Sequence, residues 1–192
     1  MRRLALLLLC IIFSISASAQ ENIYFNLKSD GAFYINESKV DTILTFPGLS
    51  AQQLYNKVKS SLIKVYNNPD VVISENAPIS LSVFPLVSDW CRINPIGNGF
   101  VYYSSNYTLL FHFKDGRIKI DAPKVNDELH CSGSGLPLTR SFTDLIGRWN
   151  KTEKTYAKNK AHMDAIEAAV NLAIVQVVKD LYENPDSDAE AW

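Results

Sequence analysis

The feature that most limits how this chain can fold is the pair Asp115 and Gly116, which separates two runs of alternating apolar and polar residues. A two-residue Asp-Gly loop favours the type I′ turn, whose twist matches that of an antiparallel hairpin. The pattern therefore predicts a strand over residues 100–114 that turns directly into a second strand over residues 117–120.

This turn also fixes which residues of the two strands face each other. The predicted cross-strand pairs are Lys114 with Arg117, Phe113 with Ile118, His112 with Lys119 and Phe111 with Ile120. Because side chains alternate between the two faces of a strand, the apolar pairs share one face and the basic pairs share the other. We call the side chains of His112, Lys114, Arg117 and Lys119 the basic hairpin face.

A second strong local signal predicts a helix over residues 51–66. Ser50 is a favourable N-cap, and Gln53 stands where a capping box needs it. Apolar residues then recur at helical spacing, at Leu54, Val58, Leu62 and Val65. This stripe predicts a helix that packs one side on a core.

The remaining patterns predict an antiparallel sheet and two further helices. Strands are expected over residues 40–46, 71–74 and 79–83. A long loop is expected over residues 88–99 and a polar, flexible loop over residues 127–137. A short helix is expected over residues 142–149, and a long one over about 161–182. The expected fold class is therefore α+β, in the order β-α-β4-α.

The N-terminal residues 1–19 have the three parts of an export signal. Arg2 and Arg3 precede a short apolar run, and Ala17-Ser18-Ala19 forms a cleavage site before Gln20. We expect an exported protein, either periplasmic or secreted, with no transmembrane segment in the mature chain. Residues 20–39 are expected to form an arm or edge strands, and residues 184–192 a disordered tail.

Removal of the leader also removes Cys10 and leaves Cys91 and Cys131. An even pair in an oxidising compartment predicts a disulfide, with two unrelated thiols as the alternative. The whole chain has 19 basic and 20 acidic residues. Loss of Arg2 and Arg3 with the leader leaves 17 basic residues, so the net charge of the mature chain is about −3. Nucleic-acid binding is therefore not expected, because its affinity comes from Lys and Arg at the phosphates.

The segment 46–55, FPGLSAQQLY, followed about sixty residues later by KDGR at 114–117, resembles an uncharacterised family of exported bacterial domains. Those domains have a TATA-binding-protein-like (TBP-like) fold, in which helices cover one face of a curved antiparallel sheet. The resemblance covers roughly residues 30–125. We expect the TBP-like domain over residues 40–125, with residues 126–183 adding a loop and C-terminal helices that pack on the sheet. It implies no catalytic residue and no ligand.

Two groups of residues are candidates for a binding surface. One is the basic hairpin face, which suits an anionic glycan, a lipid headgroup or an acidic protein; the alternative is an ordinary solvated strand face. The other is Trp90 with Arg92, since such residues often anchor contacts; packing of Trp90 onto its own domain is the alternative.

Catalytic, cofactor and metal signatures are not found. His130 and Cys131 beside Asp127 and Glu128 lack the spaced ligand pairs of a zinc site. Our first hypothesis is therefore an exported, non-enzymatic binding domain with a protein, glycan or lipid partner. The rival is a small secreted hydrolase whose site combines distant residues, such as His112 or His130 with carboxylates.

Overall fold

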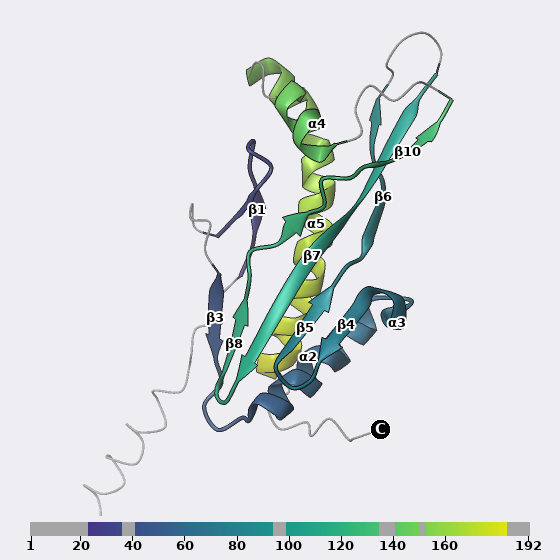
Figure 1. Ribbon diagram of the computed structural model, residues 1–192. Coiled ribbons are helices and arrows are strands. Elements are labelled where there is room, and N and C mark those ends of the chain that lie inside the picture. Colours follow the sequence, from purple (N-terminus) through teal and green to yellow (C-terminus); the bar gives the residue numbers. More distant parts are fainter. Residues whose placement is uncertain (1–22, 36–40, 94–98, 135–140, 150–152, 184–192) are drawn as a thin grey trace, which may run out of the picture.

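The computed structural model describes residues 23–35, 41–93, 99–134, 141–149 and 153–183 (Figure 1). The predicted leader, its cleavage site and the predicted tail lie outside these residues. The described part is α+β, with a large, twisted antiparallel sheet and helices packed on one of its faces. The expected fold class is confirmed.

One long strand, β7 (Val101–Lys114), is the spine of the sheet. Its C-terminal half lies between β8 (Arg117–Ile120) and β5 (Ser80–Val83). The edges there are β3 (Thr42–Thr45) and β4 (Ile73–Asn76), giving the order β3-β8-β7-β5-β4. The register of the β7–β8 hairpin is the predicted one, pair for pair. The turn is not the predicted type I′, because Gly116 has a positive φ of 74° but Asp115 does not.

The N-terminal half of β7 also has a neighbour on each side. β6 (Leu86–Ile93) continues the side of β5, while β9 (Lys124–Val125) and β10 (His130–Gly133) continue the side of β8. Both edges of β7 are thus paired along most of its length. Figure 1 shows the strand crossing the whole sheet.

Alternation along β7 separates a core face from an open face. Side chains at odd-numbered positions from Val101 to Phe113 are buried, and those at even-numbered positions are mostly half-buried. Ser80 and Ser82 of β5 likewise point away from the core, as their alternation with Leu81 and Val83 predicts. No described helix covers the open face, which looks toward the viewer in Figure 1.

Two helices supply most of the other layer. α2 (Ala51–Val65) begins with the predicted capping box between Ser50 and Gln53. α5 (Glu153–Glu183) carries the predicted apolar stripe, which is buried under the sheet. α4 (Phe142–Trp149) follows the predicted cap, in which the Asp144 amide donates to Ser141 Oγ at 3.0 Å.

The N-terminal arm forms a small hairpin of β1 (Asn26–Leu27) and β2 (Phe33–Tyr34), held on α5. Asn171 of α5 accepts a hydrogen bond from the Phe25 amide and donates one to its carbonyl, both at 2.8 Å. Glu167 accepts from the Leu27 amide at 2.7 Å. Phe25 and Phe33 are fully buried beneath this clamp.

The predicted structure of four segments needs correction. The segment predicted as a loop over residues 88–99 contains most of β6, and the polar loop over 127–137 contains β10. Residues 69–72 form a short helix, α3 (Pro69–Val72), before β4 begins. Helix α5 begins at Glu153, earlier than predicted, and therefore includes the lysine-rich segment taken for a connection.

The predicted disulfide between Cys91 and Cys131 is not formed. Both residues lie opposite Tyr103, Cys91 in β6 on one side of β7 and Cys131 in β10 on the other. Adjacent strands are about 4.8 Å apart, so the two cysteines are about 10 Å apart, whereas a disulfide spans less than about 7 Å between Cα atoms.

Among the described helices, the part of α5 from Lys160 to Glu183 is long and apolar enough to cross a membrane, by length and composition alone. The sequence reading expected no such stretch after the leader. In the fold, its residues Ile166, Val170, Ile174 and Val177 are fully buried in the domain core.

Candidate functional site

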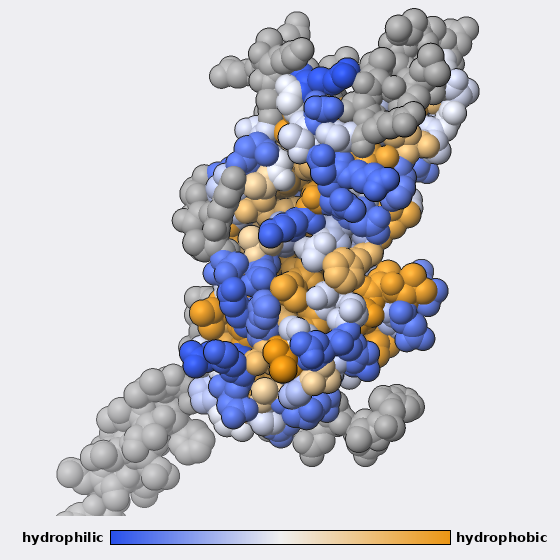
Figure 2. Space-filling model, in the orientation of Figure 1, coloured by the Kyte–Doolittle hydropathy of each residue, from blue (hydrophilic) through white to orange (hydrophobic). Residues whose placement is uncertain are grey.

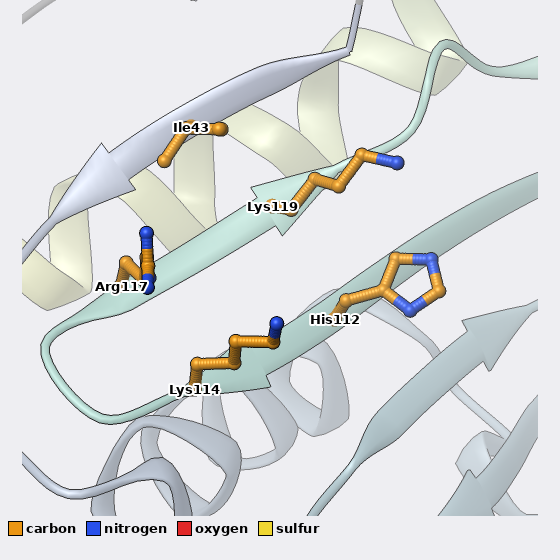
Figure 3. A pocket seen from close by; sticks show the side chains of 5 residues that line it. All are labelled: Ile43, His112, Lys114, Arg117 and Lys119. Carbon is orange, nitrogen blue, oxygen red and sulfur yellow. The ribbon is translucent and has the colours of Figure 1, made fainter.

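The β7–β8 hairpin brings together all four residues of the basic hairpin face. His112 and Lys114 extend from β7, Arg117 and Lys119 from β8, and all lie on the open face beside Ile43 of β3 (Figure 3). These five side chains line a shallow hollow of about 140 Å³. Ile43, which is 56% exposed, gives the hollow an apolar wall that the sequence reading did not include.

Lys119 is held by two carboxylates. Its Nζ lies 2.7 Å from Asp41 Oδ2 and 2.8 Å from Asp121 Oδ1. Hydrogen bonds to Asp121 and then to Asp41 raise the pKa of Lys119 to about 12. Its charge is therefore permanent at physiological pH but largely balanced by its neighbours.

Asp121 also contacts the histidine of the cluster. His112 Nε2 lies 3.1 Å from Asp121 Oδ2. Partial desolvation acts to raise the pKa of Asp121, but hydrogen bonds with Lys119 and His112 outweigh it, and the net pKa is lowered. Asp121 is thus a stable anion that holds the side chains of Lys119 and His112 in place on the basic hairpin face.

Lys114 and Arg117 differ from Lys119. Both are exposed and directly opposite each other, and neither makes an ion pair with any residue in the described ranges. Like charges directly opposite on neighbouring strands are destabilising. The hollow thus presents two adjacent positive charges that the described part of the fold does not neutralise.

The second candidate pair, Trp90 and Arg92, lies on opposite faces of the sheet. Trp90 is only 6% exposed and packs edge-on against Phe142 of α4, with ring centroids 5.9 Å apart. Its proposed role as an exposed contact is wrong, and packing onto its own domain is what occurs. Arg92 does lie on the open face, with its guanidinium 3.6 Å from the centre of the Phe100 ring.

Arg92 is far from the basic hairpin face. It is paired with Tyr102, twelve residues along β7 from Lys114. At about 3.3 Å per residue the separation is about 40 Å, so the two candidate groups are the ends of one long surface.

The histidines give little support to a hydrolytic site. His112 has an orienting carboxylate in Asp121, but no hydroxyl or thiol in the described part of the chain is hydrogen-bonded to it. His130 is exposed in β10, and His162 Nδ1 lies 3.3 Å from the Trp90 carbonyl oxygen. No cluster of three or more potential metal ligands occurs among the described residues.

Sequence reasoning missed Asp41 and Asp121 as members of the cluster. Asp41 precedes β3, whose pairing with β8 brings it beside Lys119 from far along the chain. Asp121 directly follows β8, so its position one residue beyond the predicted strand was the available signal.

No family model matches the chain, and no curated protein matches it. One similar solved structure is a TBP-like protein from Parabacteroides distasonis, with a TM-score of 0.42 and 12% identity over 71% of this chain and 90% of that chain. Another is a DUF4468 family protein from Bacteroides ovatus, with a TM-score of 0.35 and 12% identity over 85% of this chain and 89% of that chain. Neither similarity assigns a function to this chain.

Proposed function

We propose that this protein is an exported, non-enzymatic binding domain that holds an anionic group in the hollow of the basic hairpin face. The observation that carries the proposal is the pair formed by Lys114 and Arg117. The two cations face each other across the hairpin, beside an apolar wall, and no described carboxylate pairs with them.

The contrast with Lys119 supports this proposal over an ordinary solvated strand face. On such a face, basic residues reduce repulsion by pairing with nearby acids, as Lys119 does with Asp41 and Asp121. Lys114 and Arg117 instead retain their mutual repulsion, which an anionic ligand would relieve. Arginine and lysine are suitable ligands for carboxylate, sulfate and phosphate groups.

Binding to immobilised anionic surfaces tests the proposal. We would compare polygalacturonate with its methyl ester, phosphatidylglycerol vesicles with phosphatidylcholine vesicles, and polyglutamate with bare matrix. The wild-type protein should bind at least one charged member over its control. The double variant Lys114→Gln/Arg117→Gln should bind about tenfold more weakly or worse, which corresponds to about 1.4 kcal/mol.

The matched control is Lys64→Gln/Lys179→Gln, which removes the same charge from exposed lysines of α2 and α5. It should bind like the wild type, and circular dichroism should show both double variants folded. Equal binding by the two double variants, or no binding to any charged surface, would contradict the proposal.

A further inference from the structure

The open face carries cations well beyond the hollow. Besides Lys114, Arg117 and Lys119, the described residues place Lys124 opposite Thr108 and Arg92 opposite Tyr102, both on this side of the sheet. Lys124 and Arg92 are exposed. The cations therefore follow β7 from one end to the other, although the whole chain has a net charge of −1.

Uncharged polar side chains lie between these cations. Asn106 and Thr108 of β7 share the open face, and Ser132 of β10 and Ser82 of β5 lie opposite members of the same row. Ser104 is on the same row but is buried, and its Oγ accepts a hydrogen bond from the Asp89 amide. Figure 2 shows hydrophilic residues from the β7–β8 hairpin toward the β6 and β10 end, with apolar residues between them. The surface offers hydroxyl and amide groups along its length and charges at intervals.

We propose that the ligand is an extended anionic polysaccharide that lies along β7 on the open face. This inference rests on the proposed function, in which one acidic group occupies the hollow at Lys114 and Arg117. Lys124 then contacts the middle of the polymer, and Arg92 contacts it about 40 Å from the hollow. The hydroxyl and amide side chains between them pair with sugar hydroxyls.

Charge spacing favours a polysaccharide over a nucleic acid. Duplex DNA carries one charge per about 1.7 Å, so a 40 Å length would bring more than about twenty phosphates to five cations. Asp89 also lies on this surface, within hydrogen-bond distance of Ser104. An acid there repels a backbone phosphate, but it accepts hydrogen bonds from sugar hydroxyls, which a polysaccharide carries on every unit and duplex DNA lacks.

Strand pairing argues against an acidic peptide. Extended peptides are commonly bound by addition to an exposed sheet edge, where backbone hydrogen bonds supply affinity. The cationic row follows the central strand β7, whose edges are already occupied by β5 and β6 on one side and by β8, β9 and β10 on the other. Only side chains are available for recognition along this line.

Calorimetry with oligogalacturonates of increasing length tests the inference. Affinity should rise with length until the oligomer spans about 40 Å, and then level off. Lys124→Gln and Arg92→Gln should each weaken binding of the long oligomer about three- to tenfold, and more at low salt, while leaving the shortest binding oligomer unaffected. Arg92→Lys and Lys124→Arg keep the charges and should bind like the wild type.

The outcomes separate this inference from the proposed function. If Lys114→Gln/Arg117→Gln loses affinity while Lys124→Gln and Arg92→Gln do not, the proposal of an extended ligand along β7 is wrong, and the proposal of an anionic group bound in the hollow is supported. If affinity is independent of all four residues, both are wrong. Tighter binding to single-stranded DNA of equal length than to the oligogalacturonate would overturn the polysaccharide in favour of a nucleic acid.

Discussion

Asp121 is the residue that most clearly ties the charged groups of the hairpin to one another. It contacts Lys119 at 2.8 Å and His112 at 3.1 Å, and these contacts lower its pKa below the usual value of 3.8. A carboxylate with a lowered pKa contributes stability above its unfolded pKa, and that stability is lost as the pH falls through the folded pKa.

Replacing this carboxylate by an amide should therefore have a pH-dependent effect on stability. At pH 7, Asp121→Asn should lower the free energy of unfolding by about 1 kcal/mol, as for a partly exposed ion pair. The difference from wild type should shrink as the pH falls below about 4. Urea unfolding at several pH values measures it, with the exposed Asp70→Asn as control. A difference that stays constant to pH 2.5 would contradict this role.

The two cysteines should differ sharply in reactivity because the fold places them in different surroundings. Cys91 is fully buried, and desolvation raises its pKa to about 12, whereas Cys131 is exposed. Thiolates are the reactive species, so a thiol reagent should modify one cysteine in the native mature protein and two after unfolding. Cys131→Ser should abolish the native reaction. If both cysteines resist the reagent until a reductant is added, Cys91 and Cys131 do form a disulfide, contrary to the structure.

At the scale of elements, side chains of α5 take the place of a neighbouring strand for the N-terminal arm. Asn171 pairs with both backbone groups of Phe25, and Glu167 accepts from the Leu27 amide. The backbone groups of Phe25 and the Leu27 amide thereby find partners outside the β1–β2 hairpin, while the Phe25 side chain enters the core.

Removing the Asn171 amide should release the arm. Asn171→Ala leaves the buried Phe25 amide and carbonyl unpaired, at an expected cost of about 2–3 kcal/mol. Asn56→Ala, at a half-buried position of α2 that bonds only to Gln52 among described groups, should cost less than about 0.5 kcal/mol. Chemical denaturation gives both values, and hydrogen exchange at Phe25 should accelerate only in the first variant. Equal stability of the two variants would show that the hydrogen bonds of Asn171 to Phe25 do not hold the arm on α5.

Elements with strong local signals could be predicted from the sequence, and those defined by distant partners could not. The Asp115–Gly116 turn and the Ser50 cap set their own geometry, so the β7–β8 hairpin and α2 were predicted nearly residue for residue. β6 was missed because its Ser88-Asp89 segment forms an irregularity with a positive φ at Asp89, which breaks the alternation. β10 is polar and exposed, and only its pairing with β7 makes it a strand.

The same distinction applies to the candidate site. The basic hairpin face could be predicted because one turn fixes it, whereas its balance of charge could not. Asp41 reaches Lys119 only through the β3–β8 pairing, and Lys124 and Arg92 join the row only through β9 and β6. The charge that a sheet face presents is thus a property of the assembled sheet.

At the scale of the whole molecule, one core joins segments from nearly the full length of the chain. Buried apolar side chains of the N-terminal arm, the sheet, α2, α4 and α5 belong to a single cluster. The arm is already part of this core at Ile23, four residues after the predicted cleavage position at Ala19. Cleavage there would leave the docked arm intact, which makes the predicted leader compatible with the fold.

Export is therefore predicted to yield a folded chain that begins at Gln20. Intact mass and N-terminal analysis of the protein from the producing bacterium should show the loss of residues 1–19 in the periplasmic or extracellular fraction. Ala19→Arg, which replaces a small residue of the cleavage site, should retain the leader and accumulate as the longer form. Ala165→Arg, on an exposed position of α5, is the matched control and should be processed normally. Full-length wild-type protein in the cytosol, with none outside it, would contradict export and with it the access of this open sheet face to an external polysaccharide.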